Sequence, residues 1–198
     1  MNHTLRESWL HTALEDHLRD YFTECGLTIP EHVRIGSGWP SRQALTRKKR
    51  RIGEAWSNTC SADKSHEIII SLYVFDPAEV LAILVHELIH VTVGVEHGHK
   101  KPFTDGMKAV GLEGKPTCTV AGGALLARMP AWIKALGPYP HARLDGRDKG
   151  KKDVCRLLLI ECPCGLKIRT TQKWLETYET PWPCPCGGEL IQEEPKDE

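Results

Sequence analysis

The sequence predicts an α+β protein that folds as one main domain followed by a small C-terminal module. Segments with helical periodicity alternate with short apolar runs bounded by turn residues, as expected when helices pack on a small sheet. A polar stretch at residues 145–153 contains no apolar side chain and separates the two parts. Beyond it, four of the eight cysteines fall between positions 162 and 186, which indicates a metal-held module.

The composition is that of an ordinary globular protein. Hydrophobic residues make up 40% and charged residues 26% of the 198 positions, which argues against a disordered or membrane-embedded chain. The 26 basic and 26 acidic residues balance, so any affinity for nucleic acid must come from a local patch. The most apolar segment, residues 83–95, contains His86, Glu87 and His90, and the N-terminus lacks the pattern of a signal peptide. We therefore expect no membrane association and a cytoplasmic location.

The N-terminal third is predicted to hold one helix and three strands. Residues 5–22 carry apolar side chains at helical intervals, and Thr4 and Glu7 have the spacing of a capping box. Short β-like pieces separated by turn residues follow at positions 33–36, 51–56 and 66–75.

A central helix is predicted from its end signals. Asp76 is a suitable N-cap, Pro77 suits the first helical position, and Gly94 can end the helix. A second helix is expected at 101–112, and residues 123–136 form one helix or two, interrupted at Pro130.

These elements define the expected domain organisation. Its parts are a main domain at 1–145, a basic linker at 146–153, a cysteine module at 154–190 that opens with a strand at 154–160, and an acidic tail at 191–198.

The central helix contains the pattern His-Glu-x-x-His at His86, Glu87 and His90. Residues four apart lie on one helix face, so the two imidazoles can bind one Zn²⁺ with the carboxylate beside them. Shuffling this composition gives roughly 0.04 such matches, so chance is a weak explanation. A catalytic zinc takes three protein ligands and leaves one position for water. His97 and His99, just beyond Gly94, are both within reach as the third ligand.

The segment around these histidines resembles one known family. His86-Glu-Leu-Ile-His90 followed by Gly98-His99-Lys-Lys-Pro-Phe103 is similar to the SprT-like (Spartan) zinc metalloproteases, and especially to small phage and bacterial members with a C-terminal zinc ribbon. The resemblance covers most of residues 1–141. It implies a zincin-like fold, with the His-Glu-x-x-His helix packed on a small sheet, and it makes His99 the third zinc ligand.

Glu87 is the candidate catalytic residue. Bound zinc would lower the pKa of a water molecule from 15.7 to about 7, and Glu87 could take the proton of that water and return it to the leaving amine. Tyr139 and His97 are both candidates for stabilising the oxyanion, and the sequence assigns neither.

The cysteine module repeats the unit Cys-Pro-Cys-Gly. Cys162, Cys164, Cys184 and Cys186 supply four thiolates that can close a structural zinc site, giving two zinc ions per chain. Cys155 could replace one of these ligands, and a pair of disulfides is the alternative. The scattered Cys25, Cys60, Cys118 and Cys155 are expected to pack as small hydrophobic residues.

Two basic stretches are candidates for nucleic-acid contact. The first is the run Arg47, Lys48, Lys49, Arg50 and Arg51, which could equally be a solvated loop. The second combines cations with an aromatic residue in the cysteine module: Lys167, Arg169, Lys173 and Trp174.

The expected function is that of a zinc endopeptidase. The SprT-like resemblance implies an enzyme that is recruited to DNA and cleaves proteins bound or crosslinked there. We also expect a monomer in a bacterial or phage-infected cell, and the basic and aromatic residues favour DNA that is single-stranded or bound without sequence preference. Two alternatives stay open: a nucleic-acid-binding zinc-ribbon regulator without protease activity, and a general cytoplasmic metallopeptidase independent of DNA.

Overall fold

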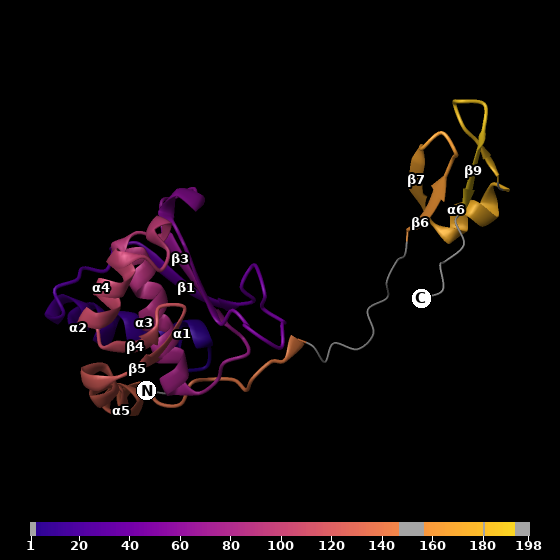
Figure 1. Cartoon of the computed structure of the whole chain (residues 1–198). Helices are drawn as coiled ribbons and strands as arrows, with labels where there is room; N and C mark the ends of the chain where they lie inside the picture. Colours follow the sequence, from indigo (N-terminus) through magenta and orange to yellow (C-terminus); the bar gives the residue numbers. More distant parts are fainter. Residues whose placement is uncertain (1–2, 147–156, 180, 193–198) are drawn as a thin grey trace. The chain divides into compact units, whose positions relative to one another are not determined.

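The computed structural model describes residues 3–146, 157–179 and 181–192. The chain divides into two compact units, Met1–Asp148 and Lys149–Glu198 (Figure 1). This division falls within the predicted linker at 146–153, of which all but Gly146 lies outside the described residues. Among the helices that the structure describes, none has the length and apolar character needed to cross a bilayer.

The N-terminal helical segment is longer than predicted and starts differently. It comprises α1 (Arg6–Ala13), a π-helical turn (Leu14–Leu18) and α2 (Arg19–Glu24). The predicted capping box is wrong: Leu5 is the N-cap and its side chain makes no capping hydrogen bond. The Glu7 carboxylate instead accepts a hydrogen bond from the Ser37 amide at 3.0 Å, so a contact with the sheet has replaced the local cap.

A three-stranded sheet forms one layer of the first unit. Its strands are β1 (Val33–Gly38), β2 (Gly53–Trp56) and β3 (His66–Ser71), in the order β1-β3-β2. β1 is parallel to β3, and β2 is antiparallel to it. The three predicted strands are confirmed, although the third ends at Ser71 rather than at 75. Because β3 lies in the middle of this order, β2 is an edge strand.

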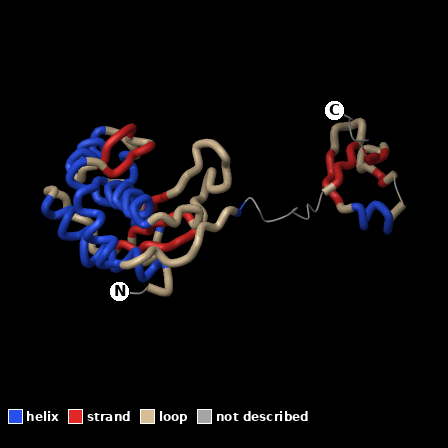
Figure 2. Tube along the Cα trace, turned by 90° about the horizontal axis from the view of Figure 1, so that it is seen from below, coloured by secondary structure: helices blue, strands red, loops and turns tan. Residues whose placement is uncertain are grey.

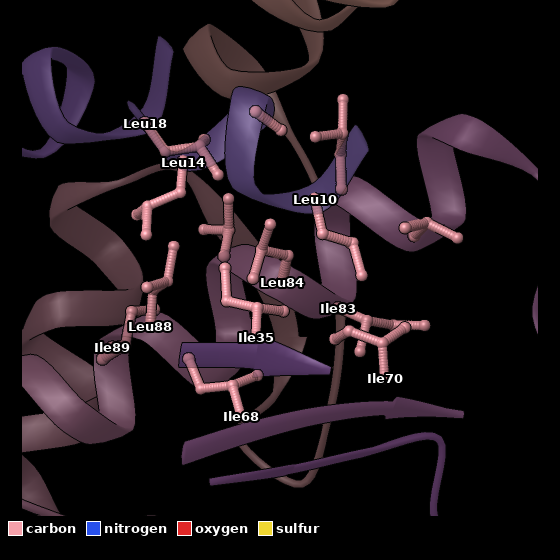
Figure 3. Packing of buried hydrophobic residues seen from close by; sticks show 14 of the residues in the cluster. Leu10, Leu14, Leu18, Ile35, Ile68, Ile70, Ile83, Leu84, Leu88 and Ile89 are labelled. Carbon is pink, nitrogen blue, oxygen red and sulfur yellow. The ribbon is translucent and has the colours of Figure 1, made fainter. Parts of the chain in front are cut away.

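The central helix α3 (Pro77–Val93) packs on this sheet. As predicted, the Asp76 side chain accepts from the Glu79 amide at 2.9 Å, and Gly94 ends the helix with φ of 102°. Leu84 and Leu88 are fully buried in a core shared with Ile35 and Ile68 of the sheet (Figure 3). Because the helix is buried on several faces, its polar residues Glu87 and His90 also lie within the protein.

The rest of the first unit contains a hairpin that the sequence did not reveal. α4 (Lys101–Ala109) ends before the predicted 112, because Leu112 begins the antiparallel pair β4 (Leu112–Lys115) and β5 (Cys118–Ala121). α5 (Gly123–Leu136) is one continuous helix that includes Pro130. Buried Met129 and Trp132 on either side of the proline hold the helix against the core.

The second unit is a small sheet with its own core, and strands dominate it where helices dominate the first unit (Figure 2). Its elements are β6 (Leu158–Glu161), β7 (Lys167–Thr170), α6 (Gln172–Thr177), β8 (Trp182–Pro183) and β9 (Glu189–Gln192), with strand order β7-β6-β9-β8. The predicted tail at 191–198 is wrong at its start, because residues 191 and 192 belong to β9. Residues 154–156 of the predicted strand and 193–198 of the tail lie outside the described residues.

Candidate metal centres and basic surfaces

Three histidines converge at the C-terminal half of α3. His86 and His90 lie one turn apart on the helix, and the chain then reverses through a short turn between Gly94 and Gly98, both of which have positive φ. This reversal brings His99 Nε2 to 3.3 Å from His86 Nε2. The candidate ligand atoms of His86, His90 and His99 all lie within 4.8 Å of one another, so the group could hold a metal ion.

The spacing of the histidines fits a tetrahedral ion. Zn–N bonds of 2.0–2.1 Å in a tetrahedron place two nitrogens about 3.3 Å apart, which is the separation of His86 Nε2 and His99 Nε2. Burial is the main cause that lowers the pKa of His86 to about 3 and that of His90 to about 4, and it also lowers the pKa of His99. The three imidazoles are therefore neutral at pH 7, as metal ligands must be.

Two residues outside α3 orient the histidines. Phe103 of α4 is fully buried, with its ring centroid 4.8 Å from that of His86, 4.4 Å from that of His90 and 4.9 Å from that of His99. Thr119 Oγ1 on β5 lies 2.9 Å from His86 Nδ1. When His86 Nε2 binds a metal, Nδ1 carries the proton and donates to Thr119, which fixes the ring.

The alternatives left open by the sequence are placed elsewhere. His97 is not part of the histidine group; its Nε2 lies 3.9 Å from Glu96 Oε1, and 44% of its side chain is exposed. Tyr139 is buried with its ring edge-on to Trp9, and Ser37, Arg6 and Glu7 supply the polar and charged surroundings of its hydroxyl. Neither residue belongs to the arrangement around His86.

Glu87 lies beside the histidines and is only 6% exposed. Burial raises the pKa of its carboxyl to about 8, against the opposing effect of the Arg51 charge. Its carboxylate fits against β2 because position 53 is a glycine: a Cβ there would lie 2.4 Å from Glu87 Oε1 and 2.7 Å from Ile83 Cγ2. Sequence reasoning missed Gly53, although a glycine inside a strand is a known sign of close approach by another group.

The four paired cysteines also converge. Cys162 and Cys186 have their sulfurs 3.6 Å apart, as do Cys164 and Cys184, while those of Cys184 and Cys186 are 3.4 Å apart. These separations exceed an S–S bond of about 2.05 Å and approach the roughly 3.8 Å expected for sulfurs around one tetrahedral zinc. The disulfide alternative is thus wrong for these four, which could hold a metal ion, whereas Cys155 lies outside the described residues.

Each cysteine pair sits in the same kind of turn. Gly165 and Gly187 have positive φ, and their amides donate to the carbonyls of Cys162 and Cys184 at 2.8 Å and 2.9 Å. The Gly188 amide points at Cys186 Sγ at 3.4 Å and is the main cause that lowers the pKa of that thiol to about 7. Such a thiol gives up its proton readily to a metal. Of the scattered cysteines, Cys60 and Cys118 are exposed, so the expectation that they are packed is wrong.

The basic run at 47–51 divides into two groups. Arg47, Lys48 and Lys49 are exposed. The Arg50 side chain is only 9% exposed, and its guanidinium lies 3.6 Å from the centroid of the Tyr73 ring. Arg51 is paired with Glu54 at 2.6 Å. Arg50 and Arg51 therefore make contacts within the protein, whereas Arg47, Lys48 and Lys49 are exposed to solvent.

The second unit presents an exposed aromatic pair. The rings of Trp174 and Tyr178 stack with centroids 5.6 Å apart and planes inclined by 15°, and both residues are exposed. The Lys173 ammonium lies 5.9 Å from the Trp174 ring, and Arg169 is exposed on β7. Lys167, by contrast, pairs with Glu161 at 2.9 Å. The sequence did not single out Tyr178, which lies one helical turn after Trp174.

Comparison of the chain with protein-family models, with curated proteins and with solved structures found no match.

Proposed function

We propose that the chain is a zinc-dependent endopeptidase of zincin-like fold, recruited to DNA, that hydrolyses proteins bound or crosslinked to DNA. The observation that carries the proposal is the convergence of His86, His90 and His99 in one possible metal site, with the buried side chain of Glu87 next to His86 in α3. The resemblance of His86–His90 and Gly98–Phe103 to the SprT-like family adds the DNA-bound substrate.

Peptide hydrolysis needs a nucleophile, a base and a way to protonate the leaving nitrogen. His86, His90 and His99 would hold a zinc ion, which would supply a water of lowered pKa and polarise the scissile carbonyl. The positive charge of such an ion would lower the pKa of Glu87 below its metal-free value, so that its carboxylate could accept the proton of the attacking water and return it to the leaving nitrogen. Thr119 and Phe103 keep the imidazoles in place during this exchange.

An extended peptide fits the geometry next to this site. β2 is an edge strand whose only strand partner in the described part of the chain is β3, and its Gly53 touches Glu87. A peptide that adds to a free sheet edge makes main-chain hydrogen bonds whatever its sequence. Such binding requires no free terminus, which favours an endopeptidase.

Recruitment to DNA is supported by two surfaces. Arg47, Lys48 and Lys49 offer exposed positive charge on the first unit. On the second unit, the stacked Trp174 and Tyr178 offer ring faces on which bases of a single strand can stack, with Lys173 beside them.

The deciding experiment is a cleavage assay on a DNA-binding protein, with and without single-stranded DNA, with Glu87→Gln as the inactive control. The proposal requires cleavage that depends on Glu87 and increases with DNA. Equal cleavage without DNA would favour the general metallopeptidase. DNA binding without any cleavage would favour the non-proteolytic regulator.

The third ligand can be tested by metal affinity. His99→Ala should lower the Zn²⁺ affinity of the first site by more than the roughly 10–100-fold typical of losing an outer hydrogen-bond partner. Thr119→Val, which removes such a partner, should fall within that range, and His97→Ala should leave the affinity unchanged. Competition titration with a chelating dye measures all three. If only His97→Ala lowered the Zn²⁺ affinity, the third ligand would be His97 and not His99.

Gly53→Ala should disturb the position of Glu87 without affecting metal binding. The added methyl group would overlap the Glu87 carboxylate and push it from its place, so peptide hydrolysis should fall by about 10²-fold while zinc stays bound. Gly36→Ala on β1 is the matched control, because a Cβ there meets nothing within 4 Å. Steady-state kinetics and zinc content give the comparison, and equal activity in both variants would contradict the close approach of Gly53 to Glu87.

DNA affinity should depend on salt with little sequence preference. Replacing Arg47, Lys48 and Lys49 together by Gln should flatten the slope of log K against log salt by about 0.7 for each single-strand phosphate that these cations neutralise in the wild type. Fluorescence anisotropy with labelled oligonucleotides at several salt concentrations measures this slope. An unchanged slope would assign DNA binding to the second unit instead.

A further inference from the structure

Arg51 differs from the other cations of its loop because it lies just before the strand that packs against Glu87. It lies two residues before Gly53, the residue of β2 that touches Glu87. The charge of Arg51 also acts on Glu87, whose pKa it lowers against the effect of burial. Arg51 therefore lies in the segment that leads into the strand packed against Glu87.

A buried carboxylate holds this guanidinium in place. Glu54 is only 8% exposed, and its Oε1 accepts from Arg51 Nη1 at 2.6 Å. The same carboxylate accepts from the Ser41 amide at 2.8 Å and from Ser41 Oγ at 2.6 Å. Burial alone would raise the pKa of Glu54, and the hydrogen bonds from Ser41 together with Arg51 bring it below its usual value. Arg51 and Glu54 thus form a charged pair, and the hydrogen bonds from Ser41 hold the Glu54 carboxylate in place.

Stability gives little reason to keep such a pair. Burying a carboxylate costs free energy that its partner repays only in part, and apolar replacements of similar shape are often as stable. The guanidinium has five N–H donors, and within the described part of the chain Glu54 takes one of them. Because 44% of the Arg51 side chain is exposed, a bound peptide can reach the remaining donors.

We propose that Arg51 is a catalytic residue that donates hydrogen bonds to the scissile carbonyl oxygen as that oxygen becomes negative, and that Glu54 is the positioning residue that aims it. This assignment rests on the proposed peptidase function. It fills the role for which Tyr139 and His97 were candidates, and it gives Arg51 a part in hydrolysis in place of DNA contact.

The reaction balances without any change in the protonation of Arg51. The water oxygen bonds to the carbonyl carbon, its proton passes to Glu87, and the π electron pair moves to the carbonyl oxygen, where the guanidinium stabilises the charge. When the double bond re-forms, the C–N bond breaks and the nitrogen takes the proton from Glu87. A guanidinium suits this role because it stays protonated at every working pH.

The test compares Arg51→Ala, Arg51→Lys and Glu54→Gln with Arg42→Ala, which removes an exposed cation from the same loop. Loss of an oxyanion donor typically lowers kcat by about 10²–10³-fold, so Arg51→Ala should do so with little change in KM. Its affinity for a phosphinic peptide, which carries a tetrahedral oxyanion, should fall by a similar factor in calorimetry. Guanidinium ion added to Arg51→Ala should restore part of the activity, which also shows that the variant is folded.

The other variants separate catalysis from structure and from DNA binding. Arg51→Lys keeps the positive charge but loses the planar guanidinium with its paired N–H donors. Glu54→Gln weakens the ion pair that orients the guanidinium. Both variants should therefore lower kcat by less than Arg51→Ala, without a change in KM or zinc content. The DNA salt slope should be the same in Arg51→Ala as in Arg42→Ala.

Two results would overturn the inference while the peptidase function stands. One is an Arg51→Ala enzyme with wild-type kcat and phosphinic-peptide affinity. The other is a defect that appears only in DNA binding and not in cleavage of a free peptide. A wild-type protein that neither cleaves peptides nor binds the phosphinic peptide would overturn the proposed function and this role of Arg51 together.

Discussion

Glu87→Gln is expected to retain zinc and the fold and to lose peptide hydrolysis by a factor of about 10² or more. Glutamine has the size of glutamate, so the packing against Gly53 is kept, but a neutral amide cannot take the proton of the attacking water. Steady-state hydrolysis of a fluorogenic peptide, with zinc measured on the same samples, separates chemistry from metal loss. Full turnover in a zinc-loaded Glu87→Gln protein would contradict the role of Glu87.

The same substitution should show a second effect that does not depend on catalysis. In the metal-free protein, burial raises the pKa of Glu87 from 4.5 to about 8. The folded state therefore holds this proton more tightly than the unfolded state, and the stability from this group is lost as pH rises from 4.5 through 8. Glutamine has no such dependence. After a chelator has removed the metal, the first unit should therefore unfold at a higher temperature in Glu87→Gln than in the wild type at pH 8, and at the same temperature near pH 4.

Local sequence signals predicted the parts of the site that are local. The ends of α3 follow from Asp76, Pro77 and Gly94, because caps act on amides within a few residues. His86 and His90 share a face because they are four residues apart on that helix. The two cysteine pairs were recognised for the same reason, since each pair and its glycine lie within four consecutive positions.

Contacts between distant segments could not be predicted in this way. Thr119 meets His86 only because β4 and β5 form a hairpin beside α3, and the pattern of residues 101–112 had suggested a single helix. The spacing of Thr4 and Glu7 favoured a capping box, and the Ser37 amide of β1 took the Glu7 carboxylate instead. All five cations at 47–51 were predicted to contact nucleic acid together. The structure separates them, because Arg50 lies over Tyr73 and Arg51 pairs with Glu54, and the sequence pattern of the run does not reveal these partners.

Replacing Cys184 and Cys186 together by Ser is expected to unfold the second unit and to leave the first intact. The core of the second unit is small, and two of its five buried residues are themselves cysteines of the proposed site: Ile160, Cys162, Leu175, Cys184 and Leu190. Structural zinc sites of this kind contribute about 10–16 kcal/mol of binding free energy to folding. So few apolar side chains cannot replace such a contribution.

Zinc content and amide exchange of the same protein measure this outcome. The wild type should hold two zinc ions per chain and the double variant one, with exchange protection lost in β6–β9 and kept in α3. Cleavage of a free peptide should continue, because His86, His90 and His99 lie in the other compact unit. Cleavage of a DNA-bound protein should fall, since the stacked Trp174 and Tyr178 would be lost with the fold of the second unit. If the variant also emptied the histidine site, the two units would not be independent, and the cysteines would have to support the catalytic centre itself.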